Sequence, residues 1–482
     1  MTDDARRRPE NHVIVLFGAT GDLSRRKLLP GLFNLHCAGL VPEHYRVIGV
    51  SRHASALTDD EFRERARSAV EERGMREPAG EQWDEFVANL FFAAADADDP
   101  SALVAAVAEA EREIGGEARR IYHLAIPPRA FEGVVAMLGE TGLADRARVI
   151  VEKPFGTDLA NAQELNRALH AVFPEADVFR IDHFLGKESV ENILALRFAN
   201  GLFEPIWNRD HVDHIQIDVP ETLTVAGRAG FYEPTGAFRD MIVTHLFQVL
   251  GFIAMEPPAM LSERLVRNET AKVFDSMKPI DPHRAVRGQY AGYRDEAGVD
   301  PASQTETFVA LEVEIDNWRW AGVPFYLRTG KSLAQSRQTI TLAFHEPPLR
   351  MFRLAGDASA SSRPNELVIE FRDPGSISAW FLAKEPGPEA RLREVAMRFS
   401  YESAFEASEL EGYERLIHDA MLGDQTLFTR GDGIERLWEV AAPLLERAPE
   451  LRLYEPGSWG PEGAETLIAP RSWHLPEPDR GR

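Results

Sequence analysis

The chain has 482 residues, of which 44% are hydrophobic and 27% are charged, and its formal net charge is −23. This length exceeds that of one typical hydrophobic core, so we expect two domains with an ordinary globular composition. The strongly acidic charge argues against nucleic acid or an anionic membrane surface as a partner. A single cysteine, Cys37, excludes an intrachain disulfide and favours a reducing, cytoplasmic location. The polar N-terminus and the lack of any apolar run near 20 residues predict neither a signal peptide nor a membrane span.

Short β-rich runs alternate with amphipathic helical stretches in the first third of the chain. The candidate strands are Val13–Phe17, Arg46–Val50, Ile121–Ala125 and Arg148–Val151, and the candidate helices are Arg26–Ala38, Asp59–Glu72, Pro100–Glu113 and Phe131–Leu138. Such alternation is typical of a doubly wound parallel sheet. We therefore expect an α/β, Rossmann-like dinucleotide-binding domain over residues 1–179.

The rhythm changes after about residue 180, where strand-like segments follow one another with little helix between them. They are His214–Val219, Thr307–Glu314, Gln338–Phe344, Leu367–Phe371 and Ser376–Ala383, and helices return at Gly236–Leu250, Tyr413–Leu422 and Gly433–Glu446. This pattern predicts a larger α+β domain over residues 180–482, with a mostly antiparallel sheet and flanking helices.

A glycine turn follows the first candidate strand directly. The turn and the start of the next helix comprise Gly18, Ala19, Thr20, Gly21, Asp22, Leu23, Ser24 and Arg25. Gly21 would let the backbone approach a phosphate while a helix N-terminus faces it. Leu16 stands where the G-x-G-x-x-G fingerprint has its first glycine, so the motif alone would also fit an ordinary turn. Its place on the first strand of a βαβ unit favours nucleotide binding.

The end of the second strand indicates which nucleotide. An enzyme that uses NAD usually has Asp or Glu here to hold the ribose 2′-hydroxyl. This chain has Ser51 and Arg52 instead, and a cation at this point favours the 2′-phosphate of NADP. The basic run from Arg25 to Lys27 adds positive charge nearby, although Arg26 fits a solvated helix face at least as well.

Four further stretches concentrate chemically active side chains. They are Glu152–Gly156, Arg180–Glu188, Arg239–His245 and Tyr326–Lys331. The first lies between a strand and a helix, at the edge where α/β sheets bind ligands. In the second, His183 and Lys187 are four apart and could share one face at a helix start, toward an anion. In the third, His245 adjoins an apolar stripe, and taken alone it would be read as a core histidine.

These stretches resemble the sequence marks of glucose-6-phosphate dehydrogenases, in the same order. The matching segments are GATGDL, EKPFG, RIDHFLGKE, FRDMIVTH and DNWRWAGVPFYLRTGK, followed by segments that begin at Tyr413, Gly423 and Gly457. The resemblance covers about residues 11–475. RIDHFLGKE is highly specific, whereas GATGDL alone is not.

The resemblance implies a role for most of these residues. His245 would be the general base that takes the proton from the anomeric hydroxyl of glucose 6-phosphate, and Asp182 would orient it and raise its basicity. Hydride would pass from C1 to NADP, giving a lactone. His183 and Lys187 would hold the phosphate. Residues implied to bind sugar hydroxyls, or to bridge substrate and cofactor, are Lys153, Glu221, Asp240 and Lys331. The resemblance also implies a cis peptide before Pro154, no metal ion, and a homodimer or homotetramer.

The chain departs from the family at three positions. Phe184 replaces a usual tyrosine, Ala226 replaces a common acidic residue, and Ser336 falls where the family has lysine or arginine. The neighbouring Arg337 could serve as the phosphate ligand in place of Ser336. Loss of one charge-assisted contact would cost roughly 1.5–3 kcal/mol, or tenfold and more in affinity.

These departures leave two alternatives open. The substrate could be another hexose phosphate or free glucose, or the chain could be a catalytically silent nucleotide binder that regulates a partner. Retention of Asp182, Lys187 and His245 together argues against the silent binder.

Overall fold

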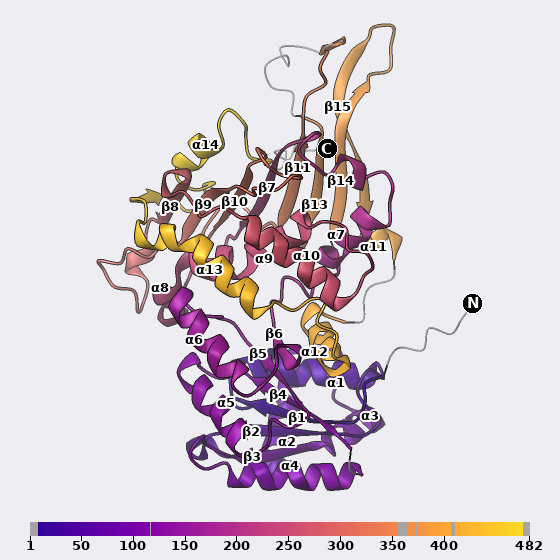
Figure 1. The fold of residues 1–482 in the computed structure, drawn as a ribbon, viewed down its shortest axis with the longest axis vertical. Helices are drawn as coiled ribbons and strands as arrows, with labels where there is room; N and C mark the ends of the chain where they lie inside the picture. The colour runs from indigo at the N-terminus through magenta and orange to yellow at the C-terminus, as the bar shows by residue number, and fades with distance from the viewer. Residues whose placement is uncertain are drawn as a thin grey trace, which may run out of the picture. The chain divides into compact units, whose positions relative to one another are not determined.

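The computed structural model describes residues 8–115, 117–349, 351–354, 364–372, 375–405 and 410–475. The chain forms two compact units, neither of which is one continuous stretch (Figure 1). The first unit comprises Met1–Gly186, Pro258–Asn268 and Ser408–Glu435, and the second comprises Lys187–Pro257, Glu269–Ala407 and Arg436–Arg482. The domain limit at residues 179 and 180 stays a prediction.

The sheet of the first unit is parallel throughout. Its strands are β1 (His12–Phe17), β2 (Tyr45–Ser51), β3 (Leu90–Ala94), β4 (Arg119–Leu124), β5 (Ala147–Val151) and β6 (Val178–Arg180). Their order is β3-β2-β1-β4-β5-β6, so the direction of winding reverses between β1 and β4. Every residue of β1 is buried, as expected for a central parallel strand. The predicted doubly wound sheet is confirmed.

Helices connect these strands and complete the unit. They are η1 (Ser24–Leu28), α1 (Leu29–Cys37), α2 (Asp59–Arg73), α3 (Gly80–Val87), α4 (Ser101–Ile114), α5 (Phe131–Glu140), α6 (Leu159–His170) and α12 (Gly412–Leu422). Local sequence explains several of their limits. At α2, for example, Thr58 and Glu61 form a capping box, which satisfies two amides at the helix start.

The second unit contains a mixed sheet of ten described strands. They are β7 (Val212–Pro220), β8 (Ala285–Tyr290), β9 (Phe308–Val313), β10 (Phe325–Gly330), β11 (Thr339–Phe344), β12 (Arg353–Leu354), β13 (Glu366–Glu370), β14 (Ser376–Lys384), β15 (Arg391–Ser400) and β16 (Leu451–Tyr454). Their order is β12-β15-β14-β13-β11-β7-β10-β9-β8-β16. Three neighbouring pairs are parallel and the other six are antiparallel, which confirms the expected mostly antiparallel sheet.

A long apolar helical run forms part of the core of the second unit. It consists of α8 (Ala229–Ala237), the π-helix η6 (Phe238–Leu246) and α9 (Phe247–Ala254). By length and mean hydropathy this run of 26 residues would suffice for a membrane span, but 89% of its most apolar 18-residue stretch is buried within the protein. Polar residues such as Asp240 and His245 interrupt the run, so a search for continuous apolar sequence does not find it.

The remaining described α-helices with residues in this unit are shorter or shared. They are α7 (Glu188–Phe198), α11 (Tyr401–Ala404) and α14 (Gly463–Ile468), together with α10 (Glu263–Ser276) and α13 (Gly431–Glu446), which contribute residues to both units.

Candidate active site

The glycine turn leaves β1 at the carboxyl edge of the parallel sheet. Gly18 has a φ of 76°, and a Cβ added there would lie 2.2 Å from the carbonyl oxygen of Ala125. The N–H of Gly18 donates to Val50 O at 3.0 Å, and that of Gly21 donates to Gly18 O at 2.8 Å. Only glycine fits at position 18. The tight turn, with the buried Ser24 Oγ that has no partner among the described residues, fits a bound dinucleotide phosphate.

The basic side chains beside this turn differ in how they are partnered. Arg25 pairs with Glu72 at 2.9 Å, Arg26 with Asp22, and Lys27 with Glu411 at 2.6 Å. Arg52 follows β2 and is exposed; its carbonyl oxygen accepts from the Ser51 and Ser55 hydroxyls, but its guanidinium forms no ion pair or hydrogen bond with a described residue. Of these four cations, Arg52 is therefore the one whose charge is available to an anionic ligand.

One side chain at the turn was not predicted from sequence. Arg65, on α2, donates a hydrogen bond to the carbonyl oxygen of Thr20 and so braces the turn. The two residues are 45 positions apart, and no motif links them.

The EKPFG segment follows β5 and carries the expected cis peptide between Lys153 and Pro154. Glu152 is held by two partners that no motif indicated: the ring of His123 lies 2.8 Å from its carboxylate, and the hydroxyl of Tyr413 donates to the same oxygen. Burial, followed by the charge of Glu152, raises the pKa of Tyr413 well above its usual value, so the phenol is a stable donor.

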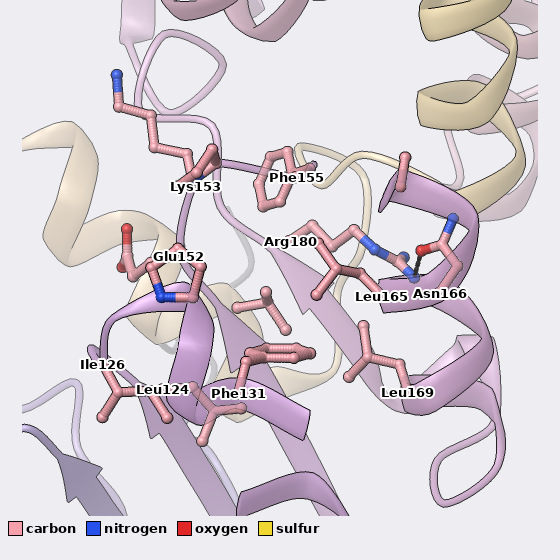
Figure 2. Close-up of a pocket in the computed structure, with 14 residues that line it drawn as sticks. Leu124, Ile126, Phe131, Glu152, Lys153, Phe155, Leu165, Asn166, Leu169 and Arg180 are labelled. Atoms are coloured by element: carbon pink, nitrogen blue, oxygen red, sulfur yellow. Dashed lines mark hydrogen bonds between the residues drawn. The ribbon is translucent and has the colours of Figure 1, made fainter. Parts of the chain in front are cut away.

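A mainly apolar pocket lies beside this segment (Figure 2). Its labelled apolar residues are Leu124, Ile126, Phe131, Phe155, Leu165 and Leu169. At one end, Arg180 donates to Asn166 at 2.9 Å, while the amine of Lys153 extends away from the pocket. Because Arg180 is buried and also binds Glu175 at 2.9 Å, its role is structural.

The RIDH segment forms a turn. Asp182 is fully buried and accepts a hydrogen bond from the Phe184 N–H at 2.9 Å, while His183 is exposed. Helix α7 begins only at Glu188, with Lys187 as its cap. The expectation that His183 and Lys187 share one helix face is therefore wrong, because the Asp182 turn delays the helix. Lys187 belongs to the second unit, whereas Asp182 and His183 belong to the first.

In the second unit, the register of two parallel strands brings two predicted residues together. Gly330 at the end of β10 pairs with Pro220 at the end of β7. Glu221 and Lys331 follow these strands, and the Lys331 ammonium forms an ion pair with the Glu221 carboxylate. The Glu221 N–H also donates to Gly330 O at 2.9 Å, which holds the segments that follow β7 and β10 side by side.

The start of β11 lies at the same end of the sheet and adds more polar groups. The Lys187 ammonium donates to the side-chain oxygen of Gln338, which was not among the predicted site residues. Arg337 Nε lies 3.9 Å from Asp218 Oδ2, and Asp218 also accepts two hydrogen bonds from Arg328 at 2.8 and 2.7 Å. Four predicted residues, Lys187, Glu221, Lys331 and Arg337, therefore gather at this end of β7, β10 and β11.

Asp240 and His245 lie on η6, which packs against β10. The predicted helix Gly236–Leu250 is not one regular α-helix: Gly236 breaks it, and the nine residues Phe238–Leu246 are π-helical. The Phe247 N–H, for example, bonds the carbonyl of Ile242, five residues earlier. His245 is fully buried. π-Helical turns occur frequently at functional sites, so this departure from 3.6-residue periodicity supports a functional reading of the segment.

A doubly wound parallel sheet with a glycine turn after its first strand is typical of a dinucleotide-binding protein. The second unit adds carboxylates, lysines and a buried histidine suited to an acid–base reaction on a polar substrate. Comparison with known proteins narrows this class. The model of the glucose-6-phosphate dehydrogenase NAD-binding domain matches residues 15–192, and that of the C-terminal domain matches residues 194–474. The chain therefore belongs to the glucose-6-phosphate dehydrogenase family.

Individual relatives match over nearly the full length. Glucose-6-phosphate 1-dehydrogenase of Aggregatibacter actinomycetemcomitans is 41% identical over 494 residues, covering 97% of this chain and 98% of the relative. Glucose-6-phosphate 1-dehydrogenase from Mycobacterium avium, a crystal structure, has a TM-score of 0.86 at 36% identity and covers 98% of this chain and 99% of its own. A structure of glucose-6-phosphate dehydrogenase in complex with its substrate, glucose-6-phosphate, has a TM-score of 0.89 at 33% identity, covering 98% and 100%.

Proposed function

We propose that the protein is an NADP-dependent glucose-6-phosphate 1-dehydrogenase, which transfers hydride from C1 of glucose 6-phosphate and gives 6-phosphogluconolactone, the first step of the pentose phosphate pathway. The observation that carries this proposal is the match of both units, end to end, to relatives named for this activity at about 40% identity. A nicotinamide dinucleotide is the cofactor that such a family requires, and the turn from Gly18 to Arg25 is where this chain would hold its phosphates.

His245 is the proposed general base. A neutral imidazole takes the proton from the C1 hydroxyl while hydride leaves C1, and the nicotinamide supplies the hydride acceptor when bound. Asp182 is the proposed partner that orients His245 and stabilises its imidazolium. Complete burial of both side chains supports these roles, because a buried carboxylate and a buried imidazole act with little competition from water.

The remaining predicted residues are proposed as substrate ligands. Lys187, His183 and Arg337 would bind the phosphate: Lys187 and Arg337 supply positive charge in a chain whose net charge is −23, and His183 supplies an exposed ring nitrogen. Asp240, Glu221 and Lys331 would bind sugar hydroxyls, and Lys153 would bridge substrate and cofactor. The Lys331–Glu221 ion pair supports this, because it holds an ammonium and a carboxylate ready at one strand end.

Arg52 is proposed to select NADP over NAD. Its guanidinium is exposed at the end of β2 and lacks a described partner, whereas the neighbouring cations are paired with carboxylates. A 2′-phosphate would give it a charge-assisted contact that a 2′-hydroxyl does not.

A homodimer or homotetramer in the cytoplasm completes the proposal. Strands β14 and β15 support the assembly: they pair beyond the end of β13 and expose apolar side chains, Leu382 at 37% and Met397 at 63%. A second copy would cover such strands, which an isolated chain leaves open to water.

The test is NADP reduction, followed at 340 nm, with glucose 6-phosphate, galactose 6-phosphate and glucose as substrates. We expect the highest kcat/KM with glucose 6-phosphate. A preference for free glucose would show that the substrate is unphosphorylated. No reduction of NADP or NAD with any of the three sugars would refute the proposed dehydrogenase activity.

A further inference from the structure

The helix that carries Asp240 and His245 begins at a break that requires glycine. Gly236 separates α8 from η6 with a φ of 67° and a ψ of 172°. A Cβ at this position would lie 2.5 Å from Oε1 of Glu306 and 3.0 Å from its Cδ. Gly236 is therefore needed both for its backbone conformation and for the close approach of Glu306.

Glu306 satisfies two amides at this break. It lies just before β9, and its Oε1 accepts a hydrogen bond from the Phe238 N–H at 3.1 Å. Its carbonyl oxygen accepts one from the Ala237 N–H at 3.0 Å. The first amides of a helix have no partner within the helix, and a carboxylate beside them is favoured by the helix dipole. Glu306 thus caps η6 from a position 68 residues later in the chain.

The cap is buried and its charge is balanced. Glu306 is only 6% exposed, and its second oxygen accepts hydrogen bonds from Arg287 Nη2 at 3.0 Å and Nε at 3.3 Å. Arg287 is itself held by the carbonyls of Gln304, at 2.8 Å, and Pro449, at 3.1 Å. A buried carboxylate is stable only with such partners, so these bonds fix the position of the cap.

The register of η6 links the cap to the chemistry. Asp240 and His245 are five residues apart, which at 3.6 residues per turn would place them about 140° apart around the helix. Bonding between residues five apart instead brings them toward one face. Tyr232 connects the two ends of this segment in another way: burial, then the charges of Asp240 and Glu306, raise its pKa well above the usual value, so both carboxylates act on the same buried phenol.

We propose that Glu306 is a positioning residue for the dehydrogenase reaction: by capping η6 at the Gly236 break, it sets the position of the π-helical segment and so places Asp240 and His245. The inference rests on the proposed function, because the reaction supplies its main readout. Glu306 acts through η6 and takes no part in proton or hydride transfer.

The experiment compares Glu306→Ala, Glu306→Gln and the control Glu366→Ala in the full chain. Glu366, the first residue of β13, is also buried, at 5% exposure, and pairs with His474 instead of with an amide of η6. Since a displacement of about 1 Å can lower a rate about 100-fold, we expect Glu306→Ala to reduce kcat roughly 10- to 100-fold. Glu306→Gln retains an acceptor and should recover most of that loss. The KM for NADP should stay within about twofold, because the nucleotide turn belongs to the other unit.

Hydrogen exchange provides a readout that does not depend on activity. Amides of residues 237–247 should exchange faster in Glu306→Ala but not in Glu366→Ala, even where both variants lose similar thermal stability. If Glu306→Ala does not fold, Glu306→Asp replaces it in both the kinetic and the exchange measurements. This variant keeps the charge but shortens the reach to the Phe238 N–H, so it should show the same loss of kcat and the same faster exchange.

The outcomes separate the two claims. A wild-type protein without activity on any hexose phosphate refutes the proposed function. An active wild type with unchanged kcat and unchanged exchange in the folded Glu306 variant overturns the positioning role.

Discussion

Replacing Arg52 with alanine tests whether the guanidinium at the end of β2 selects NADP over NAD. Arg25, Arg26 and Lys27 are each paired with a carboxylate, so Arg52 is the cation with charge to offer a 2′-phosphate. A hydrogen bond to a charged group contributes about 1.5–3 kcal/mol, and each 1.4 kcal/mol is tenfold. We therefore expect Arg52→Ala to lower kcat/KM for NADP roughly 10- to 100-fold and to leave that for NAD within about twofold.

The assay is steady-state kinetics with both cofactors at saturating glucose 6-phosphate. Arg25→Ala is the matched control, because Arg25 is also a cation beside the glycine turn but is paired with Glu72 at 2.9 Å. Its effect on the NADP-to-NAD ratio should be small. Added salt should weaken the NADP preference of the wild type and not that of Arg52→Ala, since an exposed charge pair is screened. Equal losses with both cofactors would refute the 2′-phosphate assignment.

Three further predictions follow from the local structure. Gly18→Ala should lower NADP affinity at least tenfold by calorimetry, because its Cβ would lie 2.2 Å from Ala125 O. The control Gly39→Ala, with a similar φ of 71° and no atom within 4 Å, should cost stability but not NADP affinity. Equal NADP affinity in both variants would contradict phosphate binding at the Gly18 turn. Ser336→Lys adds a cation and should raise kcat/KM for glucose 6-phosphate about 3- to 10-fold relative to that for glucose. Ser336→Ala is the control for the lost 2.8 Å hydrogen bond from the Thr222 N–H. An unchanged ratio in Ser336→Lys would show that position 336 does not face the phosphate. Burial lowers the pKa of His12 from 6.5 to about 4, so the unfolded chain binds more protons between these values and the free energy of unfolding should fall by about 3 kcal/mol as pH drops through that window. In urea unfolding, His12→Asn should flatten this dependence, and an unchanged slope would assign the acid sensitivity to other groups.

Local sequence was sufficient to predict the first unit because its strands and helices alternate with clear periodicity. Val13–Phe17 is continuously apolar, as a strand buried on both faces must be, and it lies at the centre of the sheet. β3 was not predicted, since Leu90–Ala94 is a short edge strand with only partial burial. The segments Pro258–Asn268 and Ser408–Glu435 join this unit through contacts distant in sequence, which periodicity does not report.

Candidate site residues could be proposed from sequence where they cluster within a motif, but not where a contact that depends on the fold brings them together. Lys331 and Glu221 were found through family motifs, but their ion pair depends on the parallel register of β7 and β10. Gln338, Arg65 and Glu306 carried no signal, because each meets its partner across strands or helices far apart in the chain. The π-helix was also not predicted, because the apolar residues of η6 fit the 3.6-residue spacing of an α-helix approximately. Only the break at Gly236 and the hydrogen bonds between residues five apart distinguish η6 from an α-helix.

If His245 is the base of a glucose 6-phosphate dehydrogenase, its replacement must slow the reaction, so the initial rate of NADP reduction is compared between the wild type and His245→Ala. We expect kcat to fall roughly 10²- to 10⁴-fold in the variant, with the affinity for glucose 6-phosphate little changed. A variant that turns over at nearly the wild-type rate would contradict it.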